Sequence, residues 1–128
     1  MKKPKHLTAL EWEIMNVIWQ SDRFPVTVRQ VLERAYPDGE KAYTTVQTIM
    51  NNLTEKGLLA REKIGPVNVY KPILSAGTAQ KRETDRFVDK VFNGSFFSLA
   101  NFLLSSGKLS PDELDQLKNI LEKNKKGN

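Results

Sequence analysis

The sequence predicts a mainly α-helical fold with one small β-hairpin, organised as two consecutive domains. Apolar residues recur at helical spacing in six stretches of the chain, which is the primary signal for amphipathic helices. Two extended segments flank Gly65-Pro66, a dipeptide typical of the turn at the tip of a hairpin. Ser75-Ala76-Gly77 then interrupts the pattern, so we expect one domain at residues 1–74 and a helical domain at residues 75–128.

The composition limits the classes of function. The chain of 128 residues has 20 Lys and Arg against 15 Asp and Glu, a net charge of +5 that is compatible with nucleic acid but also common in solvated proteins. It has no cysteine, which excludes disulfides, thiolate catalysis and Cys-ligated metals. No apolar run reaches the ~20 residues that span a membrane, and the N-terminus lacks the apolar segment of a signal peptide. We therefore expect a cytoplasmic protein without membrane contact.

Two capping boxes mark the starts of the first two helices. Thr-Ala-Leu-Glu at 8–11 and Thr-Val-Arg-Gln at 27–30 each place Thr at the N-cap and Glu or Gln at N3. The first helix is apolar around most of its circumference, so it must be covered from two directions. Trp12 and Trp19 lie on the same side of it, and we expect both to be buried.

The stretch 42–57 predicts a recognition helix for the DNA major groove. Its buried stripe is expected to consist of Val46, Ile49, Met50 and Leu53. The other face carries short hydroxyls and amides, where a solvated helix usually carries Lys, Glu and Arg. Amides can pair bidentately with adenine, and a Thr methyl can pack on the thymine methyl. The expected contacts to bases and adjacent phosphates are Thr44, Thr45, Gln47, Thr48, Asn51 and Asn52. An ordinary polar-faced helix is the alternative for this segment taken alone.

The two ends of this helix also have sequence signals. Thr44 and Gln47 predict a third capping box, and Gly57 is expected at the C′ position. Since the N4 residue would be Thr48, no hydrophobic staple can form at the start. We infer that this end stays polar because it faces something other than the core.

The segments 58–64 and 67–72 predict the hairpin, and three helices followed by a hairpin make a winged helix-turn-helix. Arg61 at the base of this wing, and Lys63 and Asn68 near its tip, are expected to reach phosphate or the minor groove. The alternative for Arg61 and Lys63 is a charged, solvated edge strand that resists aggregation.

Three more helices are expected in the second domain, at 78–92, at 96–104 after a Ser95 cap, and from Pro111 onward after a Ser110 cap. The first is expected to bury a stripe of Phe87, Val88, Val91 and Phe92. The segment 96–104 is apolar nearly all round, too apolar for exposure and too short for a membrane.

A second copy of the chain is the economical cover for this apolar surface, because three short helices in ~50 residues rarely make a self-sufficient core. We expect a C2 dimer that presents two recognition helices. The alternative is that the helices fold back on the first domain within a monomer. The expected dimerisation residues are Phe87, Val91, Phe96, Phe97, Leu99, Phe102, Leu103, Leu114, Leu117 and Leu121.

Several motifs resemble the penicillinase-repressor family of bacterial transcription regulators. They are Leu-Thr-Ala-Leu-Glu-Trp-Glu-Ile-Met-Asn-Val-Ile-Trp at 7–19, Ala-Tyr-Thr-Thr-Val-Gln-Thr-Ile-Met-Asn-Asn-Leu at 42–53, Glu-Lys-Gly-Leu-Leu at 55–59, Phe-Val-Asp-Lys-Val-Phe-Asn-Gly-Ser at 87–95 and Leu-Ser-Pro-Asp-Glu-Leu at 109–114. The resemblance covers nearly the whole chain in order, and the last two motifs look like that family's dimerisation region.

The resemblance implies a homodimeric repressor that binds double-stranded operator DNA with twofold symmetry. It also implies, for the antibiotic-responsive branch, a sensor-linked protease as partner and cleavage at an Asn-Phe bond in the dimerisation region. Asn101-Phe102 is the candidate bond in this chain. The copper-responsive branch uses clustered cysteines, and their absence here excludes a thiolate copper switch.

Enzymatic function is not expected, and neither is a cofactor or a metal site. His6, the sole histidine, precedes the first helix and is expected to be a solvated tail residue. Asp112 and Glu113 lie in the first turn of a helix, where capping and the helix dipole account for them. The rival to DNA-binding repression is a winged helix used for protein–protein contact without DNA.

Overall fold

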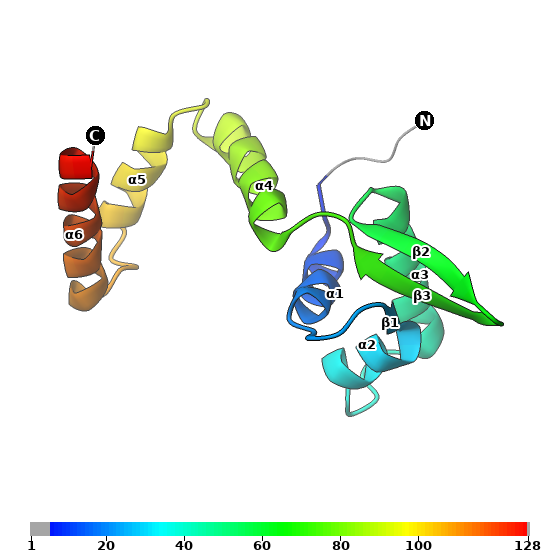
Figure 1. Ribbon diagram of the computed structural model, residues 1–128. Helices are drawn as coiled ribbons and strands as arrows, with labels where there is room; N and C mark the ends of the chain where they lie inside the picture. The colour runs from blue at the N-terminus through cyan, green and yellow to red at the C-terminus, as the bar shows by residue number, and fades with distance from the viewer. Residues whose placement is uncertain (1–5, 128) are drawn as a thin grey trace. The chain divides into compact units, whose positions relative to one another are not determined.

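The computed structural model describes residues 6–127, with side chains described to residue 125, and confirms the predicted fold class. Six helices and a small three-stranded antiparallel sheet make up the described chain (Figure 1). It divides into two compact units, one ending at Lys81 and the other beginning at Arg82. This division falls inside the fourth helix, and the boundary at residues 74/75 stays a prediction. None of the described helices is long and apolar enough to cross a membrane.

Three helices form the body of the first unit: α1 (Ala9–Trp19), α2 (Val28–Ala35) and α3 (Tyr43–Glu55), each in contact with the other two. The two predicted capping boxes are confirmed. Thr8 accepts from the Glu11 N–H and donates its own N–H to the Glu11 carboxylate, and residues 27 and 30 repeat this arrangement. Each box supplies acceptors for backbone N–H groups that have no partner inside a helix.

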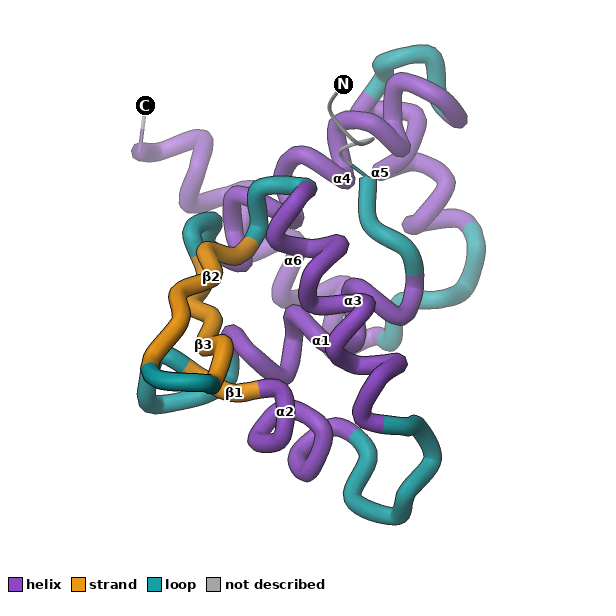
Figure 2. The backbone as a smooth tube through the Cα atoms, turned by 90° about the vertical axis from the view of Figure 1, so that its right-hand side faces the viewer, coloured by secondary structure: helices purple, strands orange, loops and turns teal. Residues whose placement is uncertain are grey.

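The sheet consists of β1 (Val26–Thr27), β2 (Leu59–Ile64) and β3 (Val67–Pro72) in the order β1-β3-β2. The predicted hairpin is confirmed, and Figure 2 shows its two strands with β1 beside β3. The two-residue strand β1 was not predicted, because it is too short to carry an alternating pattern. With β3 in the centre, β1 and β2 are the edge strands of the sheet.

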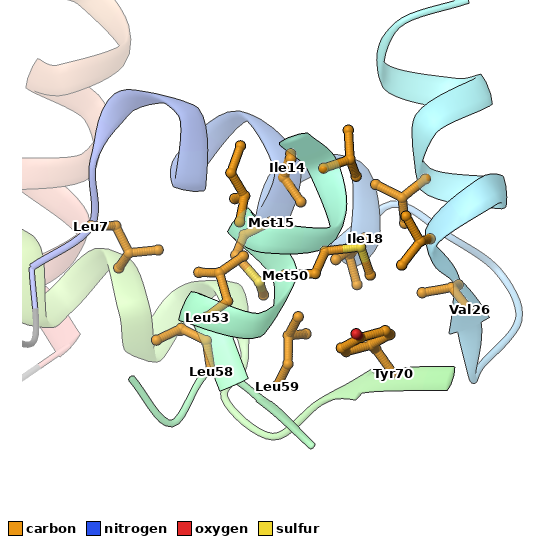
Figure 3. Packing of buried hydrophobic residues seen from close by; sticks show 14 of the residues in the cluster. Leu7, Ile14, Met15, Ile18, Val26, Met50, Leu53, Leu58, Leu59 and Tyr70 are labelled. Carbon is orange, nitrogen blue, oxygen red and sulfur yellow. The ribbon is translucent and has the colours of Figure 1, made fainter. Parts of the chain in front are cut away.

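The hydrophobic core of the first unit lies between the three helices and the sheet. The predicted stripe of α3, residues 46, 49, 50 and 53, is buried as expected. It meets Ile14, Met15 and Ile18 of α1 and the ring of Tyr70 from β3 (Figure 3). Since these residues are almost completely withdrawn from solvent, the position of α3 is determined by close packing on both sides.

The expectation that Trp12 and Trp19 are buried is wrong, because both are only partly buried at the margin of the core. Their ring centroids lie 6.0 Å apart with tilted planes, and the Trp19 indole N–H donates to the Leu74 carbonyl at 2.9 Å. An indole N–H must find an acceptor, and the chain leaving β3 provides one at the edge of the core.

A buried ion pair joins the start of α1 to the end of α3. Lys56 Nζ lies 2.6 Å from Glu11 Oε1, and the two side chains are 9 % and 5 % exposed. The same ammonium donates to the His6 carbonyl at 3.1 Å, and the same carboxylate oxygen accepts from the Thr8 N–H at 2.8 Å. Both charges therefore have further hydrogen-bond partners, which a buried ion pair requires to be tolerated.

The second unit contains most of α4 (Ala76–Val91), together with α5 (Phe96–Ser105) and α6 (Pro111–Gly127). Ser95 and Ser110 cap α5 and α6 as predicted. The expected buried stripe of α4 is wrong for a single chain: Val88 is buried and Phe92 partly buried, but Phe87 and Val91 are 46 % and 53 % exposed. Phe92 does link two helices, since its ring lies 5.9 Å from Phe87 and 6.0 Å from Phe102.

Candidate DNA-binding surface

The C-terminal end of α3 is closed as the sequence predicts, by Gly57 at C′ with φ +87°. Its N–H donates to the Thr54 carbonyl at 3.1 Å, and the Leu58 N–H donates to the Leu53 carbonyl at 3.0 Å. These two bonds make a Schellman motif, with Leu53 and Leu58 buried together beneath it. The chain can then turn directly into β2.

The predicted capping box at the start of α3 is wrong. The helix begins at Tyr43, and its N-cap is Ala42, which makes no side-chain capping bond. The Ala42 carbonyl accepts from the N–H groups of Thr45 and Val46, so Thr44 lies within the first turn. The sequence signal failed because Thr-x-x-Gln also occurs inside helices, and Thr44 lies two residues after the N-cap.

The short polar side chains of α3 are exposed to different degrees on the side away from the buried stripe. Thr44 and Thr48 are exposed, and Thr45, Gln47 and Asn52 are partly exposed. Their hydroxyls and amides are within reach of solvent along the first three turns, as a recognition helix requires.

Asn51 is held by the wing and is only partly exposed. Its Oδ1 accepts from the Tyr70 hydroxyl at 2.8 Å and from Arg61 Nη1 at 2.9 Å. Burial raises the pKa of Tyr70, and the neighbouring Arg61 charge opposes this shift. The sequence placed Asn51 on the outer face of the helix but gave no sign of these two bonds.

The wing residues share one face of the hairpin. Arg61 lies opposite Tyr70, and Lys63 lies opposite Asn68 next to the turn. Alternate residues of a strand point to the same side, so Arg61, Lys63 and Asn68 all lie on the face that Tyr70 turns toward α3. Arg61 and Lys63 are exposed and Asn68 is partly exposed. The place of Arg61 and Lys63 on β2 also fits the alternative of a solvated, aggregation-resistant edge strand.

Arg29 and Tyr43 are two residues that the sequence reasoning missed on this side of the molecule. The Arg29 guanidinium lies 5.4 Å from the centre of the Tyr43 ring, a cation–π contact between the starts of α2 and α3. Together with Thr27 and Val67 they line a depression of about 350 Å³. The cluster joins α2, α3 and the tip of the wing, and no sequence motif announces it.

The predicted dimerisation residues form an apolar surface of the second unit. Leu99 is partly buried and the others are exposed, by between 37 % for Leu117 and 79 % for Phe97. Helices α5 and α6 enclose an apolar groove of about 470 Å³ between them. It is lined by Ala100, Leu103, Leu104, Leu109, Glu113, Gln116, Leu117, Ile120 and Leu121. Nothing within the described part of this unit covers that surface.

The candidate cleavage bond, Asn101-Phe102, lies within α5, and both residues are exposed. The Asn101 carbonyl is also engaged, because it accepts from the Ser105 hydroxyl at 2.8 Å. A protease would therefore meet this bond in a helical conformation.

Three packed helices followed by a hairpin that lies against the third define a winged-helix protein, and the family can be assigned from the sequence. The profile of the family described as "Penicillinase repressor" matches residues 7–123, so the chain belongs to the penicillinase repressor family. It is thus a DNA-binding transcriptional repressor and not an enzyme.

Two relatives and one solved structure illustrate this likeness. The penicillinase repressor of Bacillus licheniformis is 29% identical over 125 residues, covering 98% of this chain and 96% of that protein. The methicillin resistance regulatory protein MecI of Staphylococcus aureus is 27% identical over 121 residues, covering 94% and 97%. The solution structure of the DNA-binding domain of the repressor BlaI matches 59% of this chain and 90% of that domain, with a TM-score of 0.50 and 30% identity.

Proposed function

We propose that the chain acts as a homodimer on a palindromic operator, read through α3 and the wing, and that opening the second unit releases it. The observation that carries this proposal is the short polar face of α3 beside the exposed basic residues of the wing. Two relatives named as penicillinase repressors and one named as a resistance regulatory protein support it. We place the protein in the cytoplasm because its operator DNA lies there.

The contacts to DNA divide between base reading and phosphate binding. Gln47 and Thr48 are accessible on the second turn of α3, where an amide suits adenine and a methyl suits thymine. Lys63 and Arg29 carry exposed charges at the wing and at the start of α2, where we assign them to phosphates. This division makes separate predictions for specificity and for salt dependence.

Dimerisation is supported by the apolar surface of the second unit. Monomeric proteins rarely leave large contiguous apolar patches in water, and here aromatic and leucine side chains on all three helices are exposed. A second copy would cover them and bring two recognition helices to one operator. Joining two half-sites makes the second contact intramolecular, which can raise affinity ~10²–10⁴-fold.

Release by a sensor-linked protease is the part of the proposal that depends most on the family resemblance. The exposed position of Asn101-Phe102 supports access, but proteolysis of a helical bond requires local unwinding first. Dissociation of the dimer, which we expect to free α5, would therefore favour cleavage.

The experiment on DNA reading measures affinity for an operator duplex and for a random duplex over a range of salt concentrations. Gln47→Ala should cost about 1–3 kcal/mol on the operator and little on random DNA. Lys63→Ala should weaken both and lower the salt slope by about one. Gln80→Ala and Lys71→Ala are matched controls, since Gln80 lies on α4 and Lys71 on the opposite face of the hairpin. Equal losses for Gln47→Ala on the two duplexes would refute base reading.

The experiment on dimerisation places one charge in the apolar groove of the second unit. Leu103→Glu should dissociate the dimer in sedimentation equilibrium and remove much of the ~10²–10⁴-fold gain from the second half-site. Ser98→Glu puts the same charge at an exposed polar position of the same helix and should leave both properties unchanged. The dimer proposal fails if Leu103→Glu binds a full palindrome as tightly as the unmodified chain does.

A further inference from the structure

We propose that Asn51 is a positioning residue that fixes the wing on the recognition helix, and that it offers DNA only hydrogen-bond donors. It would then not read adenine, although its place on α3 suggests that role. This inference rests on the proposed function, because it concerns how the α3–wing surface meets DNA.

One oxygen atom ties α3 to both strands of the wing. Asn51 Oδ1 receives the Tyr70 hydroxyl from β3 at 2.8 Å and Arg61 Nη1 from β2 at 2.9 Å. Arg61 and Tyr70 are directly opposite each other in the ladder, so both bonds act on the same rung of the hairpin. The Tyr70 ring is fully buried, which gives this rung a rigid support.

The donors determine the orientation of the Asn51 amide. A guanidinium has only N–H groups and no acceptor, so the side-chain atom that faces Arg61 must be the oxygen. The two protein donors occupy the two lone pairs of this oxygen. Only the amide nitrogen of Asn51, with its two hydrogens, remains to contact DNA.

This orientation removes the usual pairing of Asn with adenine. That pairing requires the side-chain oxygen to accept from adenine N6 while the amide nitrogen donates to N7. With Oδ1 occupied, Asn51 can only donate, and its acceptors would be N7 or O6 of guanine, N7 of adenine, O4 of thymine or a phosphate oxygen. Asn51 alone therefore discriminates weakly between bases.

The consequence for the wing concerns Lys63. Lys63 follows Arg61 by two residues on the same face of β2, so the tie at the base of the wing also orients the side chain near its tip. If the tie is cut, the wing loses a hydrogen-bonded anchor to α3, and the contact of Lys63 with DNA should weaken although Lys63 itself is intact.

A double-mutant cycle with full-length protein tests this coupling. The probe is a duplex that the unmodified chain selects from random-sequence DNA. Lys63→Ala lowers affinity by some factor in the unmodified chain. In the Asn51→Ala background this factor should be at least about threefold smaller, because the effects of coupled residues are non-additive. The effect of Lys63→Ala on the salt slope should shrink in the same way. Thr48→Ala with Lys63→Ala is the matched control, and this pair should be additive because Thr48 makes no contact with the wing among the described hydrogen bonds.

Tyr70→Phe provides a second cycle that leaves the DNA surface untouched. It removes one donor to Asn51 from a buried position, so it should reproduce part of the coupling with Lys63, which loss of a base contact would not do. It also decides the question if Asn51→Ala does not fold. The ranking of affinities over single-base variants of the selected duplex should be the same for Asn51→Ala and the unmodified chain.

Two results would separate this inference from the proposed function. Additive cycles, together with a changed base ranking at one position in Asn51→Ala, would make Asn51 a base reader and overturn the inference alone. If the unmodified chain enriches no sequence over random duplex, the proposed function fails, and the inference fails with it.

Discussion

Replacing Lys56 with Met tests the buried ion pair that joins α1 to the end of the recognition helix. Methionine keeps most of the apolar stem of lysine and removes the ammonium. The Glu11 carboxylate would then lose a partner at 2.6 Å in a site where its side chain is 5 % exposed, and it would keep the Thr8 N–H. The His6 carbonyl would also lose a donor.

The expected cost is large, because removing one member of a buried pair leaves an uncompensated charge. Such changes destabilise proteins by about 3–5 kcal/mol, a substantial part of the roughly 5–15 kcal/mol that holds a domain folded. Adding Glu11→Gln to Lys56→Met should recover much of the loss, since no charge then remains buried and the amide can still serve the Thr8 N–H. The two changes together should therefore cost less free energy of unfolding than the sum of the two single changes.

Urea unfolding followed by tryptophan fluorescence measures this directly, since Trp12 and Trp19 both lie on α1. Lys71→Met is the control: it removes an exposed lysine from β3, and its effect should stay within about 0.5 kcal/mol. A loss below about 1 kcal/mol for Lys56→Met, or a double variant less stable than Lys56→Met alone, would refute the reasoning.

Two further predictions concern the same unit. Trp19→Ala should cost about 2–4 kcal/mol in urea unfolding, because the variant loses the ring contact with Trp12 and the bond to the Leu74 carbonyl. This is somewhat below the range for a fully buried Trp, since the ring is partly exposed. A loss under about 1 kcal/mol would place the ring in solvent. Burial, and then the hydrogen bond to Glu13, raises the pKa of Tyr36 from 10.0 to about 12. The contribution of the Tyr36 hydroxyl to the free energy of unfolding is therefore complete below pH 10 and is lost as the pH rises to 12. The difference in unfolding free energy between the unmodified chain and Tyr36→Phe should accordingly shrink between pH 10 and 12, and a difference that is constant over this interval would contradict the shift.

Local sequence signals predicted those parts of the fold that depend on neighbouring residues. The capping boxes at Thr8 and Thr27, the C′ glycine at 57 and the buried stripe of α3 all follow from spacing within a few residues. The failed capping box at Thr44 shows the limit of such signals. Ala42 became the N-cap because packing determines where the helix begins, and a local motif does not report packing.

Features that join distant parts of the chain could not be predicted in this way. Glu11 meets Lys56, and Asn51 meets Arg61 and Tyr70, only after the fold is formed. The candidate site was predicted to the extent that α3 was assigned an outer polar face, but helical periodicity does not distinguish a side chain in solvent from one held by a neighbouring strand. For the second unit, the pattern of apolar residues predicted surfaces that need a cover, and a single chain leaves them exposed.

The start of α3 lacks a side-chain cap, and this affects how the thermal stability of such a protein can be raised. An Asp at position 42 would supply the missing cap and should stabilise the free helix by about 1 kcal/mol. The same carboxylate would occupy the end of the helix where the proposed surface receives a polyanion, and it would repel each incoming phosphate. Selection for heat resistance alone would favour that Asp, so thermostability and operator affinity make opposite demands on this one residue.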